Sequence, residues 1–129
     1  MGFTDAIGAA LRRYAEFDGR ATRPEFWWYV LFYVLVQLAG GVLDAALFPN
    51  AVYGVLGNIA ALALLLPTVA VTTRRLHDID RSGWWQLVGL IPVVGVFVLI
   101  WLCAQRGTEG PNRFGAPPAS APGRDTFVP

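Results

Sequence analysis

Three long apolar runs dominate the chain and predict three membrane-spanning helices. They cover residues 26–48, 51–73 and 84–104, and Asp44 is the only charged residue within them. Because a helix rises about 1.5 Å per residue, each run is long enough for a hydrocarbon core of about 30 Å. Pro67 in the second run and Pro92 with Gly95 in the third predict kinks in these helices. We therefore expect an all-α integral membrane protein with three transmembrane helices.

The first 25 residues are more polar, and residues 3–17 have a helical period. One stripe carries the apolar residues Phe3, Ile7, Ala10, Leu11, Tyr14 and Phe17, whereas charged residues fall mostly on the other side. This pattern predicts an amphipathic helix that lies along the membrane surface and precedes the first span. The expected parts are an interfacial helix and turn over residues 1–25, a three-span domain over 26–104 and a Gly/Pro-rich tail over 105–129. The last dozen residues of that tail are expected to be disordered, because they bury too little apolar surface to fold.

Composition supports lipid as the surroundings of most of the chain. Of the 129 residues, 55% are hydrophobic and only 15% are charged, which is too few to cover a water-soluble domain. The net charge of +1 argues against nucleic acid as a partner. Cys103 is the only cysteine and His77 the only histidine, so we expect no disulfide within the chain, no metal site and no cofactor.

The arginines are distributed unevenly around the predicted spans. Seven of the ten lie in the N-terminal segment and in the loop between the second and third spans. Three crossings would place these two regions on one side of the membrane and the tail, with the other three arginines, on the opposite side. Since arginine is enriched in cytoplasmic loops, we expect the N-terminus in the cytoplasm and the C-terminus outside.

Polar and aromatic residues gather on the predicted cytoplasmic side, next to the first and third spans. Guanidinium groups bind phosphate or carboxylate in a bidentate manner, and tryptophan side chains anchor at the membrane interface. One interpretation is a recognition patch for lipid headgroups or a protein partner. The other is that these charges and tryptophans only fix the topology of the loop. The candidate ligand-binding residues are Arg20, Arg23, Glu25, Arg75, His77, Asp78, Arg81, Trp84 and Trp85.

A second set of polar residues lies inside the first two spans. Gln37, Gly40 and Asp44 are three and four residues apart, so they share one helix face. Asn58 is expected at a similar depth to Asp44 in the second span. Polar groups in the membrane face the bundle interior, where small residues allow helices to approach closely. A structural clamp between the helices is favoured over an ion pathway, because a single shallow carboxylate does not make a relay.

Three motifs resemble those of a known family. They cover residues 17–27 (FDGRATRPEFW), 74–85 (RRLHDIDRSGWW) and 107–115 (GTEGPNRFG). Together they resemble the small bacterial inner-membrane proteins of the YhaH and YhaI type, domain-of-unknown-function family eight hundred and five. The resemblance implies a multi-pass protein of the bacterial inner membrane, but neither a substrate nor a reaction. Because a topology signal alone does not need the residue order of the middle motif, the resemblance gives the matched residues more weight as a shared site or packing unit.

The leading functional hypothesis is a non-catalytic membrane protein whose cytoplasmic patch binds lipid headgroups or a protein partner. One alternative is a homo-oligomeric transporter or channel, with a route lined by Gln37, Asp44 and Asn58. Another alternative is a lipid-modifying enzyme in which His77 transfers protons and Asp78 orients it. The sequence contains neither a nucleophile elbow nor a phosphate-binding loop, so we do not expect an enzyme.

Overall fold

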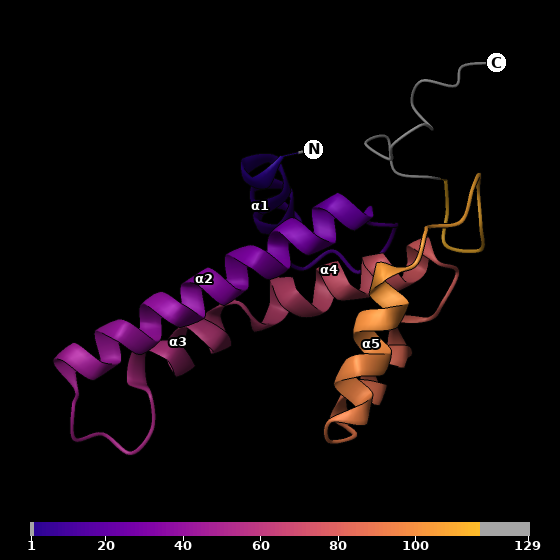
Figure 1. The fold of residues 1–129 in the computed structure, drawn as a ribbon. Coiled ribbons are helices and arrows are strands. Elements are labelled where there is room, and N and C mark those ends of the chain that lie inside the picture. The colour runs from indigo at the N-terminus through magenta and orange to yellow at the C-terminus, as the bar shows by residue number, and fades with distance from the viewer. Residues whose placement is uncertain (1, 117–129) are drawn as a thin grey trace.

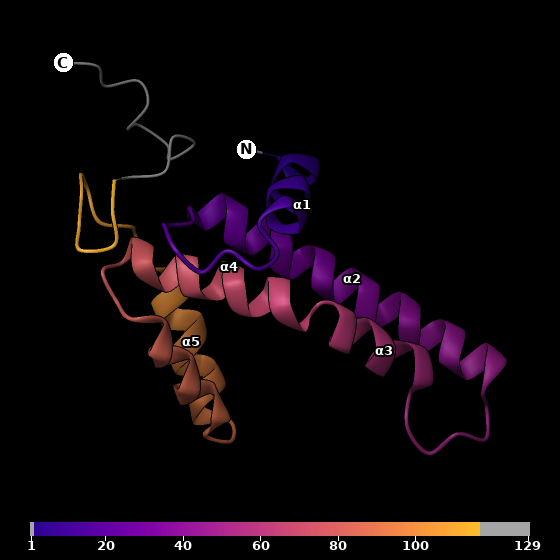
Figure 2. The same cartoon turned by 180° about the vertical axis from the view of Figure 1, so that it is seen from behind.

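The computed structural model describes residues 2–116, and these residues form helices that diverge from one end of the molecule as two arms (Figure 1). The long arm contains α2 and α3 with the first half of α4, and the short arm contains η1 and α5 (Figure 2). We call the end where the arms meet the junction; it is formed by residues 19–25, 74–81 and 103–115. The element bounds are α1 Phe3–Arg12, α2 Arg23–Leu47, α3 Val55–Ala63, α4 Leu65–Asp78, the 3-10 helix η1 Gly83–Leu90, and α5 Val94–Ala104.

The predicted amphipathic helix is present as α1, but it ends at Arg12 rather than at residue 17. Its small side chains are buried against the start of α2, and the ring of Phe3 meets Trp28 edge-on with 5.9 Å between centroids. Tyr14 and Phe17, which were expected on the apolar stripe, lie beyond the helix end and are exposed. The alanine face of α1 therefore packs on the protein itself, whereas Leu11 is 47% exposed.

The first predicted span is confirmed as α2. The Thr22 side chain caps its first turn by accepting a hydrogen bond of 3.2 Å from the backbone N–H of Glu25, and Pro24 occupies the first turn, where a missing N–H costs nothing. With 25 residues, it is the one helix of the described chain that is by itself long and apolar enough to cross a membrane.

The second predicted span is a broken helix, as the proline indicated. Helices α3 and α4 meet at Leu64 with a bend of 49°. They are long and apolar enough to cross a membrane only when they are counted together as one span. Pro67 has no N–H for the carbonyl of Ala63 four residues earlier, which explains a break at this point. The Thr68 hydroxyl donates a hydrogen bond of 2.6 Å to the Leu64 carbonyl and so helps satisfy the exposed helix end. Helix α4 then continues to Asp78, five residues beyond the predicted boundary.

The third predicted span is wrong as a continuous helix, because the chain reverses direction near Pro92. Ile91 is extended, with ψ of 120°, as is usual for a residue before proline. Val93 then takes a φ of 63°, a value that β-branched residues rarely adopt, and α5 returns alongside η1. Gly95 allows this close return, since a Cβ there would overlap the Val88 carbonyl oxygen. The sequence predicted a kink, and the structure shows a hairpin.

The reversal changes where the tail lies. Residues 105–115 hydrogen-bond with Arg20, Asp78 and His77, so they lie at the same end of the molecule as the N-terminal segment. The structure thus places the start of the tail beside that segment, while the side of the membrane on which each terminus lies stays a prediction. The predicted disorder of the final residues falls outside the described part of the chain and stays a prediction.

The buried apolar core is concentrated at the junction. It includes Tyr29 from α2, Val71 and Leu76 from α4, and Leu102 and Cys103 from α5. Along the two arms, by contrast, most large apolar side chains are exposed, including Leu38 and Val42 on α2 and Phe97 and Trp101 on α5. Such apolar surfaces are typical of helices whose solvent is lipid.

Candidate functional site

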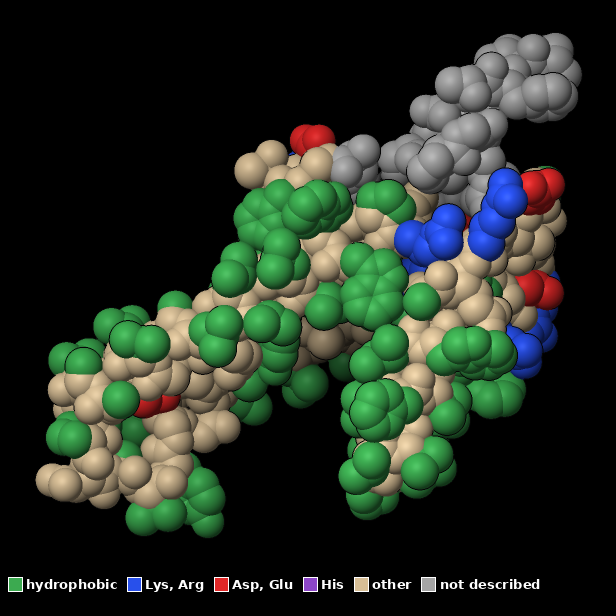
Figure 3. All heavy atoms as spheres, viewed as in Figure 1, with side chains coloured by type: hydrophobic (Ala, Val, Ile, Leu, Met, Phe, Trp, Pro, Cys, Tyr) green, Lys and Arg blue, Asp and Glu red, His purple; other side chains and the backbone are tan. Residues whose placement is uncertain are grey.

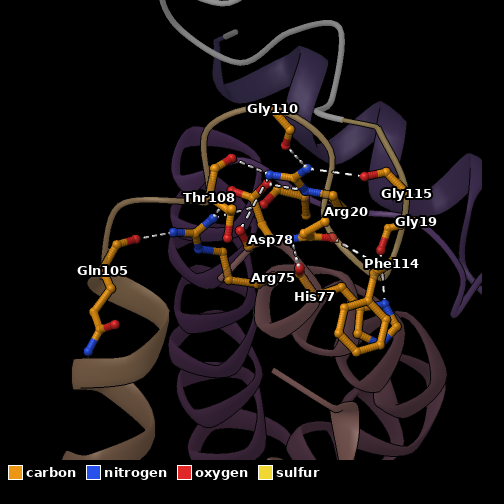
Figure 4. Close-up of polar contacts among 12 residues, drawn as sticks. Gly19, Arg20, Arg75, His77, Asp78, Gln105, Thr108, Gly110, Phe114 and Gly115 are labelled. Atoms are coloured by element: carbon orange, nitrogen blue, oxygen red, sulfur yellow. Dashed lines mark hydrogen bonds and ion pairs between the residues drawn. The ribbon is translucent and has the colours of Figure 1, made fainter. Parts of the chain in front are cut away.

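Asp78 lies at the centre of the junction, between two buried arginines (Figure 4). One carboxylate oxygen accepts a hydrogen bond of 2.8 Å from Nε of Arg20, and the other accepts one of 2.7 Å from Nη1 of Arg75. Arg20 comes from the segment before α2, and Arg75 lies one helical turn before Asp78 on α4. All three side chains are at most 3% exposed. The first and second sequence motifs are thus joined by a buried ion-pair triad.

Arg75 also fixes the end of α5. Its Nε donates 2.8 Å to the Cys103 carbonyl, and its Nη2 donates to the Gln105 carbonyl. A third bond of 2.9 Å runs from Nη1 to the Ala21 carbonyl. The last carbonyls of a helix carry partial negative charge and have no partner within the helix, so a guanidinium group is well matched to them. Arg75 therefore holds α5, α4 and the N-terminal segment together.

Arg20 organises the tail in the same way. Its Nη2 donates 2.5 Å to the Thr108 carbonyl, and its Nη1 donates 2.7 Å to Gly110 and 3.3 Å to Gly115. Gly110 and Gly115 adopt positive φ values of 70° and 121°, which turn the chain around the guanidinium group. The third sequence motif is therefore wrapped around an arginine of the first.

His77 makes a second contact between the middle motif and the tail. Its ring is stacked on Phe114 with 3.9 Å between centroids and 4° between planes. Its Nδ1 lies 2.9 Å from the Gly19 carbonyl oxygen, and because that oxygen only accepts, Nδ1 carries the proton. The His77 carbonyl accepts 2.9 Å from the Asn112 side chain. These contacts place His77 in a packing role, while the Asp78 carboxylate is engaged by the arginines.

Arg74 and Glu25 form a second buried pair, through Nη1 and Oε2. Arg74 is fully buried, and its Nε and Nη2 have no hydrogen-bond partner among the described residues. Burying charges costs several kcal/mol per ion unless partners compensate, so this pair contributes less to stability than the fully bonded Arg20 and Arg75. Backbone carbonyls supply much of the compensation at the triad, where two guanidinium groups share one carboxylate.

Four of the predicted ligand-binding residues are exposed at the edge of the junction. Arg23 is at the start of α2, and Arg81 lies before η1 with its guanidinium carbon 5.1 Å from the centroid of the Trp85 ring. Trp84 is 77% and Trp85 40% exposed. We call these four residues the rim. Arg113, in the tail, is also exposed but is paired with Asp80 at 3.3 Å.

The structure therefore divides the nine predicted residues into two groups. Arg20, Glu25, Arg75, His77 and Asp78 are buried and bonded within the chain, while Arg23, Arg81, Trp84 and Trp85 form the rim. Arg74 and the tail carbonyls were not among the predicted residues of the site. The tail motif was the available signal, but backbone carbonyl contacts leave no trace in side-chain identity.

The intramembrane polar residues join α2 to α3. Asp44 accepts 2.6 Å from the backbone N–H of Leu56 and 3.0 Å from that of Gly57, and so caps the first turn of α3 from a neighbouring helix. The Gln37 amide donates 3.3 Å to the Gly57 carbonyl. Asn58, expected near Asp44, instead donates to the Gly54 carbonyl at 2.5 Å. These contacts support the structural clamp over an ion pathway.

Residues 2–116 contain no group of three or more His, Cys, Asp or Glu side chains that could hold a metal ion. Cys103 is a free, buried thiol beside Leu102 in the core.

Comparison with known proteins identifies relatives across most of the chain. The family described as "Protein of unknown function (DUF805)" matches residues 14–116. The protein named "Inner membrane protein YhaH" of Escherichia coli (strain K12) is 41% identical over 114 residues, which cover 87% of this chain and 94% of the relative. "Inner membrane protein YhaI" of the same strain is 38% identical over 110 residues, which cover 85% of this chain and 92% of the relative. No solved structure gave a significant match.

Proposed function

The chain belongs to the DUF805 family, and from that premise we propose that it is a non-catalytic inner-membrane protein whose rim binds anionic lipid headgroups. The names of the relatives support the membrane location. The separation of charged from apolar surface in this structure supports the lipid-binding role. The junction is proposed to face the cytoplasm, because arginine-rich ends of membrane proteins are retained there.

The observation that carries the proposal is the position of exposed arginine beside exposed tryptophan at one end of two apolar arms. Between residues 26 and 73 the only charged residue is Asp44, and between 84 and 104 there is none. On the face drawn in Figure 3, Arg side chains gather around the junction, whereas the arms show hydrophobic side chains and backbone with a single acidic side chain on the long arm. With the arms in lipid, the rim lies at the depth of the headgroups, where tryptophan is enriched and arginine meets phosphate.

The buried arginines explain why the rim, rather than the whole predicted patch, is the proposed binding surface. Arg20 and Arg75 direct their donors to Asp78 and to backbone carbonyls. A lipid phosphate could reach them only by displacing those bonds. Arg23 and Arg81 are exposed, and the stacking of Arg81 on Trp85 holds its guanidinium group in place without occupying its N–H donors.

The expected strength of the interaction is modest. An arginine near an anionic membrane surface contributes about 1 kcal/mol of attraction, so Arg23 and Arg81 together contribute about 2 kcal/mol, or about 30-fold in affinity. This contribution should appear as a preference for anionic over zwitterionic lipid of the same chain length.

The proposal is tested by titrating the purified full chain in detergent with phosphatidylglycerol or phosphatidylcholine and counting bound lipids by native mass spectrometry. The double substitution Arg23→Gln and Arg81→Gln should reduce the preference for phosphatidylglycerol by about 30-fold. The matched double substitution to Lys retains the charge and should keep most of it. An unchanged preference in the Gln variant would refute the rim as the lipid site, and a co-purifying protein lost only in that variant would favour a protein partner instead.

A further inference from the structure

The short arm takes the place of the third predicted span. Its chemistry indicates where it lies in the membrane. Residues 84–104 contain no charged side chain. The one amide side chain among them, that of Gln86, donates 2.6 Å to the Thr73 hydroxyl and 3.2 Å to the Gly83 carbonyl. Large apolar side chains are exposed on both halves of this arm, including Leu90 and Phe97. Such a surface is stable in lipid and unfavourable in water.

The length of the short arm matches half of a bilayer. Helix α5 has 11 residues and is about 16 Å long, and η1 has eight residues and is also about 16 Å long. A hydrocarbon core is about 30 Å thick, so neither half of the arm can cross it. The tip at Val93 would therefore lie near the middle of the membrane.

Three backbone N–H groups at the tip bond to carbonyls within the same turn. The N–H of Ile91 bonds to the Val88 carbonyl at 3.0 Å, that of Val94 to Pro92 at 2.7 Å, and that of Gly95 to Ile91 at 3.1 Å. Pro92 has no N–H to satisfy. An irregular turn within the hydrocarbon region is tolerated only when its polar groups find partners inside the protein, and these three bonds supply part of that requirement.

Both ends of the short arm are held at the junction. Before η1, the backbone N–H of Arg81 bonds 2.8 Å to the Leu76 carbonyl. After α5, Arg75 binds the Cys103 carbonyl at 2.8 Å. The entry and exit of the arm therefore lie on the same side, and the ribbon shows its tip pointing away from the junction, as the far end of α2 does (Figures 1 and 2).

We propose that η1 and α5 form a re-entrant hairpin, which inserts among the acyl chains of the leaflet on the junction side and returns without crossing the membrane. The chain then crosses twice, through α2 and through the bent pair α3–α4, and its N-terminal segment and tail share one side. All nine arginines of residues 2–116 fall on that side, with none in the turn over residues 48–54. This distribution agrees better with the enrichment of arginine on one face than a third crossing does.

The test uses single cysteines in the full-length Cys103→Ala protein, because Cys103 is the only native cysteine. Asn50→Cys reports the far turn, Arg106→Cys the tail and Val93→Cys the tip of the hairpin. A membrane-impermeant maleimide is applied to intact cells and to inverted vesicles. We expect position 106 to react only from the side opposite position 50, and position 93 to react from neither side until detergent is added.

Four results would overturn the proposal. Labelling of position 106 from the same side as position 50 would show a third crossing. Labelling of position 93 from the side of position 50 would show that the arm spans the membrane, and labelling from the side of position 106 would show that it lies on the surface. A nitroxide spin label at position 93 should also be much more accessible to oxygen than to a water-soluble nickel complex. Inaccessibility to both reagents would instead show that protein, and not lipid, covers the tip. Reporter fusions at each terminus of the unsubstituted chain check the sidedness independently of folding of the variants.

Discussion

Arg20 and Asp78 are 58 residues apart in the sequence and form a buried ion pair, with 2.8 Å between Nε and Oδ1. The same guanidinium group holds three carbonyls of the tail, and the same carboxylate holds Arg75. Three motifs that are remote in sequence therefore form one buried structure, at the point where both arms begin. The residue order of the middle motif is explained by these contacts more directly than by a ligand.

Replacing Asp78 by Asn should destabilise the fold strongly, because two buried guanidinium groups would lose their shared counter-charge. Removing one partner from a buried ion pair costs about 3–5 kcal/mol. Asp80→Asn is a matched control: Asp80 is exposed, its pair with Arg113 is worth about 1 kcal/mol or less, and Asn tolerates its positive φ. Thermal unfolding in detergent measures both, and equal stability of the two variants would contradict the triad.

The approach of α2 to α3 should depend on Gly40 and not on its neighbour. A Cβ at Gly40 would lie 3.2 Å from the Gly57 Cα, whereas a Cβ at Gly41 meets nothing within 4 Å. Gly40→Ala should therefore destabilise the protein by about 1–3 kcal/mol through forced separation of the helices, and Gly41→Ala should not. Thermal unfolding measures the stability of both variants. A larger loss of stability in Gly41→Ala than in Gly40→Ala would contradict the close packing of α2 on α3.

Loss of the Asp44 carboxylate should loosen the first turn of α3. Asp44→Ala removes the acceptor for the N–H groups of Leu56 and Gly57, and loss of such a cap costs about 0.5–2 kcal/mol. Hydrogen exchange at those two amides should become faster, while Asn58→Ala, which removes only a local bond, should leave them unchanged. Unaltered exchange in Asp44→Ala would show that the carboxylate does not act as a cap.

The stacking of Phe114 on His77 should hold the tail against the junction. Phe114→Ala removes an aromatic contact worth about 0.5–1.5 kcal/mol and should make residues 106–115 more sensitive to proteases. Phe97→Ala is the control, because Phe97 is exposed on α5 and makes no comparable contact with the tail. If the tail of Phe114→Ala resists cleavage as well as wild-type protein does, the stacking is not what holds it.

The hydrophobic pattern predicted the long arm well because length and apolar character are local properties. It gave α2 nearly in full, and Pro67 predicted the bend between α3 and α4. It failed at Pro92, where the same signal, a proline in an apolar run, marks a reversal instead of a bend. The difference depends on the packing of Gly95 on Val88, a contact between residues on opposite sides of the turn.

The candidate site was predicted as a set of residues but not as a structure. Arginine, carboxylate and tryptophan near the spans correctly indicated a cluster at one end. Sequence alone could not separate Arg75, which is buried, from Arg81, which is exposed, because burial depends on α5 and the tail returning to the junction. That return is a consequence of the hairpin, so the chain reversal and the division of the arginines into buried and exposed groups have one origin.

Exposed arginine at the rim is proposed to bind anionic lipid, while buried arginine holds the fold. The most direct measurement is native mass spectrometry of the full chain, extracted gently from its own membrane and read for retained lipids. We predict retained phospholipids that are predominantly anionic, and their loss on Arg23→Gln with Arg81→Gln without a change in unfolding temperature. A wild-type protein that carries no lipid, or zwitterionic lipid only, would contradict the claim.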